Sequence, residues 1–292
     1  FICQITCLTT QLIIHKHVGN KKFKLNQHIM EQVSVIIPSF NRFKYLINTI
    51  LSVKQQTYKK IEIIVVNDCS TQKEYYNYDW RENGITIIHL KENSKIKFGY
   101  ACGGYVRNKG IEISKGKYIA FCDDDDIWFP EKIKRQLKAM KETKCKMSST
   151  EGLIGEAMYD EDIKYKMYNS EHYFQTLYNI YENHSLSLSK INRILKKLPI
   201  IKKMVNIKSS NILKNGFPEI WTLEFIKIHN CIITSSVMIE KSILNKIGNF
   251  KNIRNAQEDY DCWLRALEHT NCVYIKDICF YYDNKHGDGQ NY

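Results

Sequence analysis

Four consecutive aspartates, Asp123, Asp124, Asp125 and Asp126, come directly after an apolar run typical of a β-strand, residues 117–122. A strand that ends in clustered carboxylates places hard oxygen ligands at the edge of a sheet. Mg²⁺ is commonly bound in this way, by one or two carboxylates together with substrate phosphates. Most runs of charge are solvated turns, but this one lies in a basic chain and follows a strand that we expect to be buried. The run predicts a site where a divalent cation and a phosphate meet.

The elements that would position these carboxylates alternate between strand and helix patterns. Strand-like runs are expected at 33–37, 61–66, 85–90 and 117–122, and helical spacing at 42–56, 105–114 and 131–142. Such alternation predicts a Rossmann-like, mostly parallel α/β sheet with helices on both faces. Ligands of such sheets bind beyond the carboxyl ends of the strands. Three polar clusters fall there: residues 38–41, residues 67–71 and the aspartates.

The second half of the chain is harder to interpret. Residues 147–220 are less regular, after which we expect a strand-like run at 230–239, a helix around Trp263 and a last strand at 273–282. Residues 190–208 hold seven cationic side chains and no acid. A basic amphipathic helix can lie on an anionic membrane surface. An ordinary surface helix that packs its apolar stripe on the core is the favoured alternative.

Composition limits the class of protein. The 292 residues can bury one large domain, and 43 Lys and Arg against 31 Asp and Glu give a formal charge of +12. Such a surface attracts phosphates, nucleic acid or anionic membrane, and charge alone does not choose among them. The ten cysteines form no Cys-x-x-Cys pair, which indicates a reducing compartment rather than a metal-thiolate site. No apolar run reaches 18 residues, so no spanning helix is expected.

Six motifs, in this order, resemble a family 2 glycosyltransferase of the GT-A fold. They are V-S-V-I-I-P-S-F-N-R at 33–42, I-V-V-N-D-C-S at 64–70, R-N-K-G at 107–110, the aspartate run, D-I-W-F-P-E-K at 126–132 and E-D-Y-D at 258–261. The resemblance covers residues 32 to roughly 286 and is poor across the middle. It implies an inverting, Mn²⁺- or Mg²⁺-dependent transferase. The sugar would pass from a nucleotide-diphosphate sugar, a UDP-sugar first, to a hydroxyl of a glycan, lipid or protein.

The resemblance also implies roles on the donor side. Pro38, Ser39 and Asn41 would border the nucleotide base, and Asp68 would accept a hydrogen bond from it. Arg107 would lie near the nucleotide, where its guanidinium suits a phosphate or a carboxylate. Each position has a plainer alternative: a strand-ending turn, an Asx turn or helix cap, and a surface arginine.

Asp123 and Asp125 match the family's Asp-x-Asp signature. Alternate residues of an extended segment point the same way, so Asp125 is expected to bind the metal directly and Asp123 to reach the ribose or the metal. A register shift of one residue would give Asp124 a donor-binding role, and Asp126 is expected to prepare the following helix. His286 stands where some relatives place a metal- or phosphate-contacting histidine.

Asp259 matches the family's general base, a carboxylate that takes the proton of the acceptor hydroxyl. Its alternative role is an acid that stabilises the start of a helix, and Asp261 is a rival for the base. Trp128 and Trp263 either stack on sugar or belong to the core, and the core is the favoured assignment.

We expect four segments: a dispensable extension at 1–30, with Met30 as a natural start; a nucleotide-sugar-binding half at 31–146; an irregular basic insertion at 147–229; and an acceptor-side half at 230–292. A cytoplasmic enzyme, in peripheral contact with anionic membrane on the cytoplasmic face and without nucleic acid, fits these features. Two other functions stay open. A metal-dependent nucleotidyltransferase would need a Gly-rich loop after the first strand, and a non-catalytic basic module would bind nucleic acid or membrane through residues 190–208.

Overall fold

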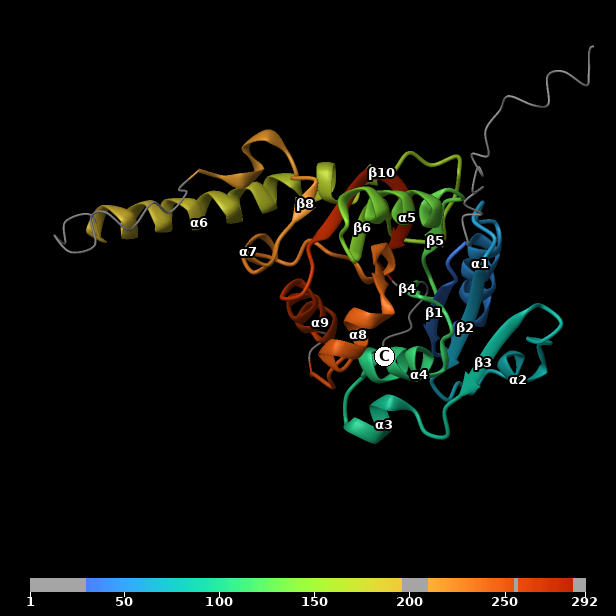
Figure 1. Cartoon of the computed structure of the whole chain (residues 1–292). Coiled ribbons are helices and arrows are strands. Elements are labelled where there is room, and N and C mark those ends of the chain that lie inside the picture. The colour runs from blue at the N-terminus through green and yellow to red at the C-terminus, as the bar shows by residue number, and fades with distance from the viewer. Residues whose placement is uncertain (1–29, 196–209, 255–256, 286–292) are drawn as a thin grey trace, which may run out of the picture. The chain divides into compact units, whose positions relative to one another are not determined.

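The structure is a computed structural model, and it describes residues 30–195, 210–254 and 257–285. Its first half alternates strands and helices as predicted (Figure 1). The elements are β1 (Val33–Ser39), α1 (Phe43–Lys54), β2 (Ile61–Asn67), α2 (Glu74–Asn77), β3 (Ile85–His89), α3 (Ser94–Phe98), α4 (Gly103–Ile113), β4 (Tyr118–Phe121), β5 (Ile127–Trp128) and α5 (Lys132–Thr143).

The second half completes the same sheet. Its elements are β6 (Met147–Gly155), β7 (Lys166–Met167), the π-helix η2 (Tyr168–His172), α6 (Phe174–Leu195), the 3₁₀ turn η3 (Ile212–Asn215), β8 (Ile220–Trp221), α7 (Leu223–Ile226), the 3₁₀ turn η4 (Thr234–Ser236), β9 (Met238–Glu240), α8 (Lys241–Ile247), α9 (Glu258–Leu267) and β10 (Cys272–Asp283).

The strand order is β3-β2-β1-β4-β9-β6-β10-β5, with β7 paired to β6 and β8 to β10. The longer ladders, β1–β2, β2–β3, β1–β4 and β6–β10, are parallel. β9 runs antiparallel between β4 and β6 and joins the two halves. The prediction of an α/β fold with a mostly parallel central sheet is confirmed.

Two hydrophobic cores lie on the two faces of this sheet because neighbouring strand residues point to opposite sides. On β1, Val35 and Ile37 pack with side chains of α1 and α5, whereas Ile36 packs with side chains of α4, α8 and α9. α4 lies close to β1 at Gly110, where an added Cβ would stand 2.6 Å from Ile36 Cγ2. A glycine at this position therefore brings the R-N-K-G helix close to the strand that leads into the site.

Two segments differ from the sequence-based expectation. The stretch expected to be irregular opens with β6, a strand inside the main sheet. The run at 230–239 was expected to be one strand, but only Met238 and Ile239 pair with neighbours, and Thr234–Ser236 forms η4. Ser236 Oγ donates to Ile233 O at 2.6 Å. Such side-chain bonds offer the backbone an alternative to the ladder.

α6 is the longest helix that the structure describes. It begins beside η2 and η3, and in Figure 1 it runs out from the sheet. Most of the basic segment 190–208 lies outside the described residues, as do residues 1–29 and His286. Across the described ranges, no helix has the length and apolarity to cross a membrane.

Candidate functional site

The carboxyl ends of β1, β2 and β4 meet at one edge of the sheet because these strands are parallel. Asn41 ties the first two ends together, since its Oδ1 accepts from Thr71 N at 2.8 Å and its own N donates to Ser70 Oγ at 2.9 Å. Its φ of 52° lies in the left-handed region, where Asn is among the more tolerant residues. Ser39 joins this edge to the aspartates, because its Oγ donates to Asp124 Oδ2 at 2.5 Å and also bonds the Tyr75 hydroxyl.

Arg42 holds two of the aspartates. Its Nη1 lies 3.2 Å from Asp124 Oδ1 and 2.7 Å from Asp125 Oδ2, and all three side chains are buried. Burial raises the pKa of Asp124 to about 7, with a further contribution from Asp125, while Arg42 and Ser39 oppose the shift. The sequence analysis assigned no role to Arg42, although it is the last residue of the first family motif. One cation thus organises the middle of the aspartate run.

Asp123 faces a different arginine. Arg107 Nη2 donates to Asp123 Oδ1 at 2.5 Å, and Arg107 Nη1 stands 3.9 Å from Glu258 Oε1. Burial opposes the charged form of Arg107, but the charges of Asp123 and Glu258 outweigh it and raise the pKa of Arg107. The backbone N of Asp123 donates to Ser235 Oγ of η4 at 2.9 Å. Arg107 therefore links the aspartate run to the first turn of α9.

The sequence suggested that Asp126 prepares the following helix, but the structure gives it another role. The residue is fully buried, its Oδ1 accepts from Asp283 N at 3.1 Å, and its carbonyl O accepts from Thr49 Oγ1 at 2.8 Å. Burial, followed by the charges of Asp125 and Asp123, raises its pKa well above the usual range. Asp126 connects the aspartate run to the end of β10 and to α1.

Asp68 is buried, and both of its carboxylate oxygens accept hydrogen bonds. Ser94 N donates to Oδ1 at 2.8 Å, while Ser94 Oγ and Asn93 Nδ2 donate to Oδ2 at 2.6 and 3.1 Å. Burial raises its pKa, and the bonds from Ser94 oppose this. Asp68 fixes the start of α3, as in the helix-cap role that was the alternative to base binding. Its Oδ1 can still accept a hydrogen bond from a ligand.

Asp259 lies in the first turn of α9 and is partly exposed. Its Oδ1 accepts from Tyr260 N at 2.6 Å, and its Oδ2 accepts from Thr234 Oγ1 at 3.3 Å. Burial raises the pKa of Asp259 to about 6; the Tyr260 N–H bond and Arg107 lower it, whereas Glu258 and Asp123 raise it. A carboxyl with such a pKa is ionised at neutral pH and still basic enough to accept a proton.

The rival residues have other contacts. Asp261 Oδ2 accepts from Arg265 Nε at 2.7 Å in an i,i+4 ion pair. Trp128 and Trp263 are buried core side chains, and the Trp128 indole donates to Ser235 O at 3.1 Å. The core assignment of both tryptophans agrees with their burial, and Asp259 is the acid of this motif that lines a cavity.

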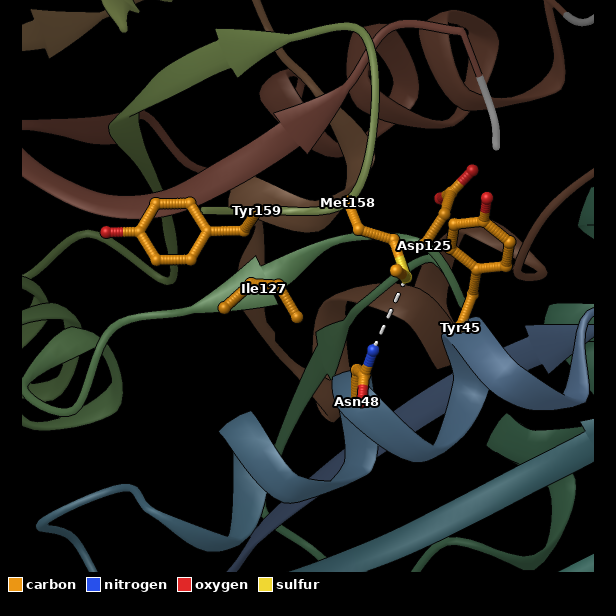
Figure 2. A pocket seen from close by; sticks show the side chains of 6 residues that line it. All are labelled: Tyr45, Asn48, Asp125, Ile127, Met158 and Tyr159. Carbon is orange, nitrogen blue, oxygen red and sulfur yellow. Dashed lines mark hydrogen bonds between the residues drawn. The ribbon is translucent and has the colours of Figure 1, made fainter. Parts of the chain in front are cut away.

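Figure 2 shows a cavity of about 270 Å³ beside the aspartate run. Asp125 and Tyr45 stand together at one side of it, and Asn48 Nδ2 donates to Met158 Sδ at 3.6 Å across it. Ile127 and Tyr159 complete the lining. Tyr45 and Met158 were not predictable from the sequence, because they approach Asp125 only through the fold of α1 and of the loop after β6.

The carboxylates suit a cation that arrives with a phosphate substrate. Burial raises the pKa of Tyr282, and the charges of Asp126, Tyr168, Asp123 and Asp125 raise it further, so the aspartate run acts electrostatically on this hydroxyl. Within the described ranges, no group of three or more His, Cys, Asp or Glu side chains is arranged to hold a metal. Mg²⁺ needs only one or two protein carboxylates when phosphates supply other ligands, so this donor set fits.

Known proteins are similar in sequence to part of this chain. The family model described as "Glycosyl transferase family 2" matches residues 34–200. TuaG of Bacillus subtilis, whose name links it to teichuronic acid biosynthesis, is 38% identical over 124 residues, 40% of this chain and 45% of that protein. WfaP of Escherichia coli, named as a UDP-Glc:alpha-D-GlcNAc-diphosphoundecaprenol beta-1,3-glucosyltransferase, is 38% identical over 119 residues, 39% of this chain and 43% of that protein. The aligned region spans less than half the length of either relative.

Solved structures share the fold. TarS of Staphylococcus aureus superimposes with a TM-score of 0.55 at 18% identity, covering 86% of this chain and 60% of that one. The mannosyltransferase PcManGT of Pyrobaculum calidifontis gives 0.54 at 13% identity, covering 87% and 57%. Both likenesses show a shared fold, of the GT-A type. Because the family model matches more than half of this chain, the chain belongs to glycosyl transferase family 2.

Proposed function

We propose that this chain is an inverting, metal-dependent glycosyltransferase that moves a sugar from a nucleotide-diphosphate sugar to an acceptor hydroxyl. The observation that carries the proposal is the Asp123–Arg107–Glu258 contact. It joins carboxylates at the end of β4, suited to a metal and a diphosphate, to the helix that bears Asp259. A donor-binding group and a base are thereby held within one edge of the sheet.

The donor would lie across the ends of β1, β2 and β4. Pro38 and Asn41 border the base, Asp68 offers the open position on Oδ1 to a ring N–H, and Arg107 faces the phosphates. Ser39 contributes by holding Asp124, to which its hydroxyl donates at 2.5 Å. A uracil base is the first choice, since the 38% identical WfaP is named for UDP-Glc.

Asp125 and Asp123 would hold Mn²⁺ or Mg²⁺, and His286 could add a ligand. When bound, the cation neutralises the charge that develops on the departing nucleoside diphosphate. Among the residues of the chain, Arg42 keeps the Asp125 carboxylate in place, with 2.7 Å between Nη1 and Oδ2.

Asp259 would act as the general base. As the acceptor oxygen bonds to the anomeric carbon, the bond from that carbon to the phosphate oxygen breaks and the acceptor proton passes to Asp259. One displacement of this kind inverts the anomeric configuration. Thr234 and Tyr260 N hold the carboxylate oxygens through the bonds described above.

The acceptor would be a glycan, lipid or protein hydroxyl, reached from the cytoplasm or from an anionic membrane surface. All eight cysteines for which the structure gives a state are free, which suits a reducing compartment. A thermal-shift screen of nucleotide sugars with and without Mn²⁺ tests the proposal. Binding only to the native state adds RT ln(1 + [L]/Kd) to its stability. We expect stabilisation that requires both the sugar nucleotide and Mn²⁺, and no stabilisation by any sugar nucleotide would contradict the proposal.

A further inference from the structure

A second cavity, of about 370 Å³, opens beside Asp259. Its walls are the loop Ile228, His229 and Asn230 on one side, and Gln257, Asp259 and Tyr260 on the other. This volume lies toward the small end of the range for ligand pockets and suits one sugar-sized group. The cavity is separate in its lining from the one beside Asp125.

Hydrogen bonds fix the two walls relative to each other. Tyr260 OH of α9 donates to Ile226 O of α7 at 2.9 Å, directly before the loop. Asn230 Oδ1 accepts from Ile232 N at 3.0 Å, which sets the orientation of its amide. The cavity is therefore built before a ligand arrives, which reduces the entropy cost of binding.

Gln257 has no structural task that its helix requires. It occupies the N-cap position of α9, where Ser, Thr, Asp or Asn are preferred, and its side chain makes no capping bond. The side chain is exposed and lines the cavity. Its amide therefore does not cap the helix and lies at the cavity, where a ligand can contact it.

The chemistry of the lining selects a class of ligand. Asn230 and Gln257 offer amides that donate and accept, and burial lowers the pKa of His229, which favours its neutral ring. Lys and Arg are absent from the six lining residues, and the carboxylate of Asp259 is the charged group among them. Amide and imidazole groups match hydroxyls, which are both donors and acceptors.

We propose that this cavity is the acceptor subsite and that it binds a neutral, hydroxyl-rich sugar ring through His229, Asn230 and Gln257, with one hydroxyl directed at Asp259. The inference rests on the proposed function. It adds that the group receiving the new bond is an uncharged sugar, rather than a phosphate-bearing or uronic acid unit.

Saturation-transfer NMR with the full chain tests this. The neutral probes are the methyl β-glycosides of glucose, galactose and N-acetylglucosamine, and the anionic probes are methyl glucuronide and glycerol 1-phosphate. We expect a saturation-transfer signal from at least one neutral glycoside and little signal from the anionic probes, because a carboxylate lines the cavity. His229→Ala and Gln257→Ala should each reduce the neutral signal at least fivefold. The matched controls, His269→Ala and Gln55→Ala, change exposed residues outside the lining and should leave it unchanged.

UDP binding with Mn²⁺, measured by calorimetry on the same samples, separates the two proposals. Loss of the neutral signal with UDP affinity retained assigns the cavity to the acceptor, whereas failure of the wild type to bind UDP contradicts the donor proposal alone. Three results would overturn the acceptor assignment: a stronger saturation-transfer signal from the anionic probes, no such signal from any neutral probe, or equal signals in the His229 and control variants.

Discussion

At the scale of single residues, the central feature is one guanidinium between two buried carboxylates. Arg42 Nη1 contacts both Asp124 and Asp125, yet Asp124 still has a pKa of about 7 because burial penalises its charge. Removal of one member of a buried ion pair typically costs 3–5 kcal/mol, since the other charge stays buried. Arg42 therefore compensates the buried charge of this pair and holds the Asp125 carboxylate at a position where it can meet a cation.

Asp125→Asn tests the metal assignment. The amide keeps the size of the side chain and removes the charge that a divalent cation requires, so Mn²⁺-dependent UDP binding should fall at least tenfold in calorimetry. Asp162→Asn, an exposed aspartate in the loop after β6, is the control and should bind as the wild type does. Unchanged affinity in an Asp125→Asn protein with a normal melting curve would reject Asp125 as a ligand.

Asp259→Asn tests the base. Because Asp125 and Asp259 lie on separate elements, donor binding and proton removal should be separable. We expect sugar transfer to fall by roughly 10²–10⁴-fold, the range typical of a general base, with UDP affinity retained. Asp261→Asn is the matched comparison on the same helix turn and should retain most of the activity. A larger loss of sugar transfer in Asp261→Asn than in Asp259→Asn would assign the role of general base to Asp261.

The raised pKa of Asp259 also predicts a pH dependence. Its carboxyl titrates at about 6 in the folded protein, above the ordinary 3.8, and only the ionised form accepts a proton. Transfer measured as kcat/KM should therefore be maximal above pH 7 and fall tenfold per pH unit below about pH 6. A rate that stays flat down to pH 5, in a protein that remains folded, would contradict this role.

At the scale of elements, a buried lysine joins α5 to η4. Lys132 has no exposed surface, and its Nζ donates to Gln136 Oε1 at 2.7 Å and to Ser236 O at 3.4 Å. Burial lowers its pKa from 10.5 to about 8. Between these values the folded state has released the proton and the unfolded state has kept it, so the free energy of unfolding should rise with pH in this window.

Lys132→Met removes that titration while it keeps the apolar stem. Urea denaturation measures the unfolding free energy of both proteins. From pH 8 to pH 10 the value for the wild type should rise relative to that for the variant, by at most about 1.4 kcal/mol per pH unit. Lys138→Met, an exposed position on α5, should give a flat difference. A flat difference for Lys132→Met as well would show that Lys132 stays protonated in the fold.

The elements also show what the sequence could predict. β1, β2 and β4 were predictable because continuous apolar runs report burial on both faces, and their ends located the aspartates. β6 was not predictable, because it begins Met-Ser-Ser-Thr-Glu. These polar side chains can be buried only because they bond to residues far along the chain. Glu151, for example, accepts from Ser170 Oγ at 2.6 Å and from Tyr274 OH at 2.7 Å.

The same limit explains which site residues were missed. Arg42 is paired with acids more than eighty positions away, and periodicity carries no information about such contacts. The apolar content of residues 230–239 predicts a strand, but the three hydroxyl residues of η4 form a turn that lies beside the site. Ser235 of that turn then accepts from Asp123 N, a role visible only in the fold.

At the scale of the whole molecule, one sheet joins donor-binding and base-bearing elements. β9 lies between β4 and β6, and α9 packs against α4, so Asp259 and Arg107 belong to neighbouring helices. A mutation that loosens α4 should therefore disturb both donor affinity and the pKa of Asp259. Such coupling is expected of an enzyme that must align two substrates before reaction.

The last prediction concerns contact between the basic segment 190–208 and an anionic membrane. Residues 190–208 carry seven of the cationic side chains and no acid, and residues 190–195 are the last residues of α6, which leads away from the sheet (Figure 1). Each Lys or Arg near an anionic leaflet contributes about 1 kcal/mol of attraction, within a Debye length of about 8 Å at physiological salt. We expect pelleting with phosphatidylglycerol vesicles that weakens with added salt, and none with phosphatidylcholine.

A charge-matched pair of variants makes the test specific. One replaces Lys196, Lys197, Lys202 and Lys203 with glutamine, and the other replaces four lysines that are exposed elsewhere, Lys44, Lys73, Lys91 and Lys276. Both lower the net charge equally, so only a localised contact distinguishes them. The first should lose at least tenfold in vesicle affinity, because four such charges are worth up to about 4 kcal/mol, and the second should lose much less. Equal losses would attribute binding to net charge alone, and equal pelleting on neutral vesicles would remove an electrostatic membrane contact from the function of this chain.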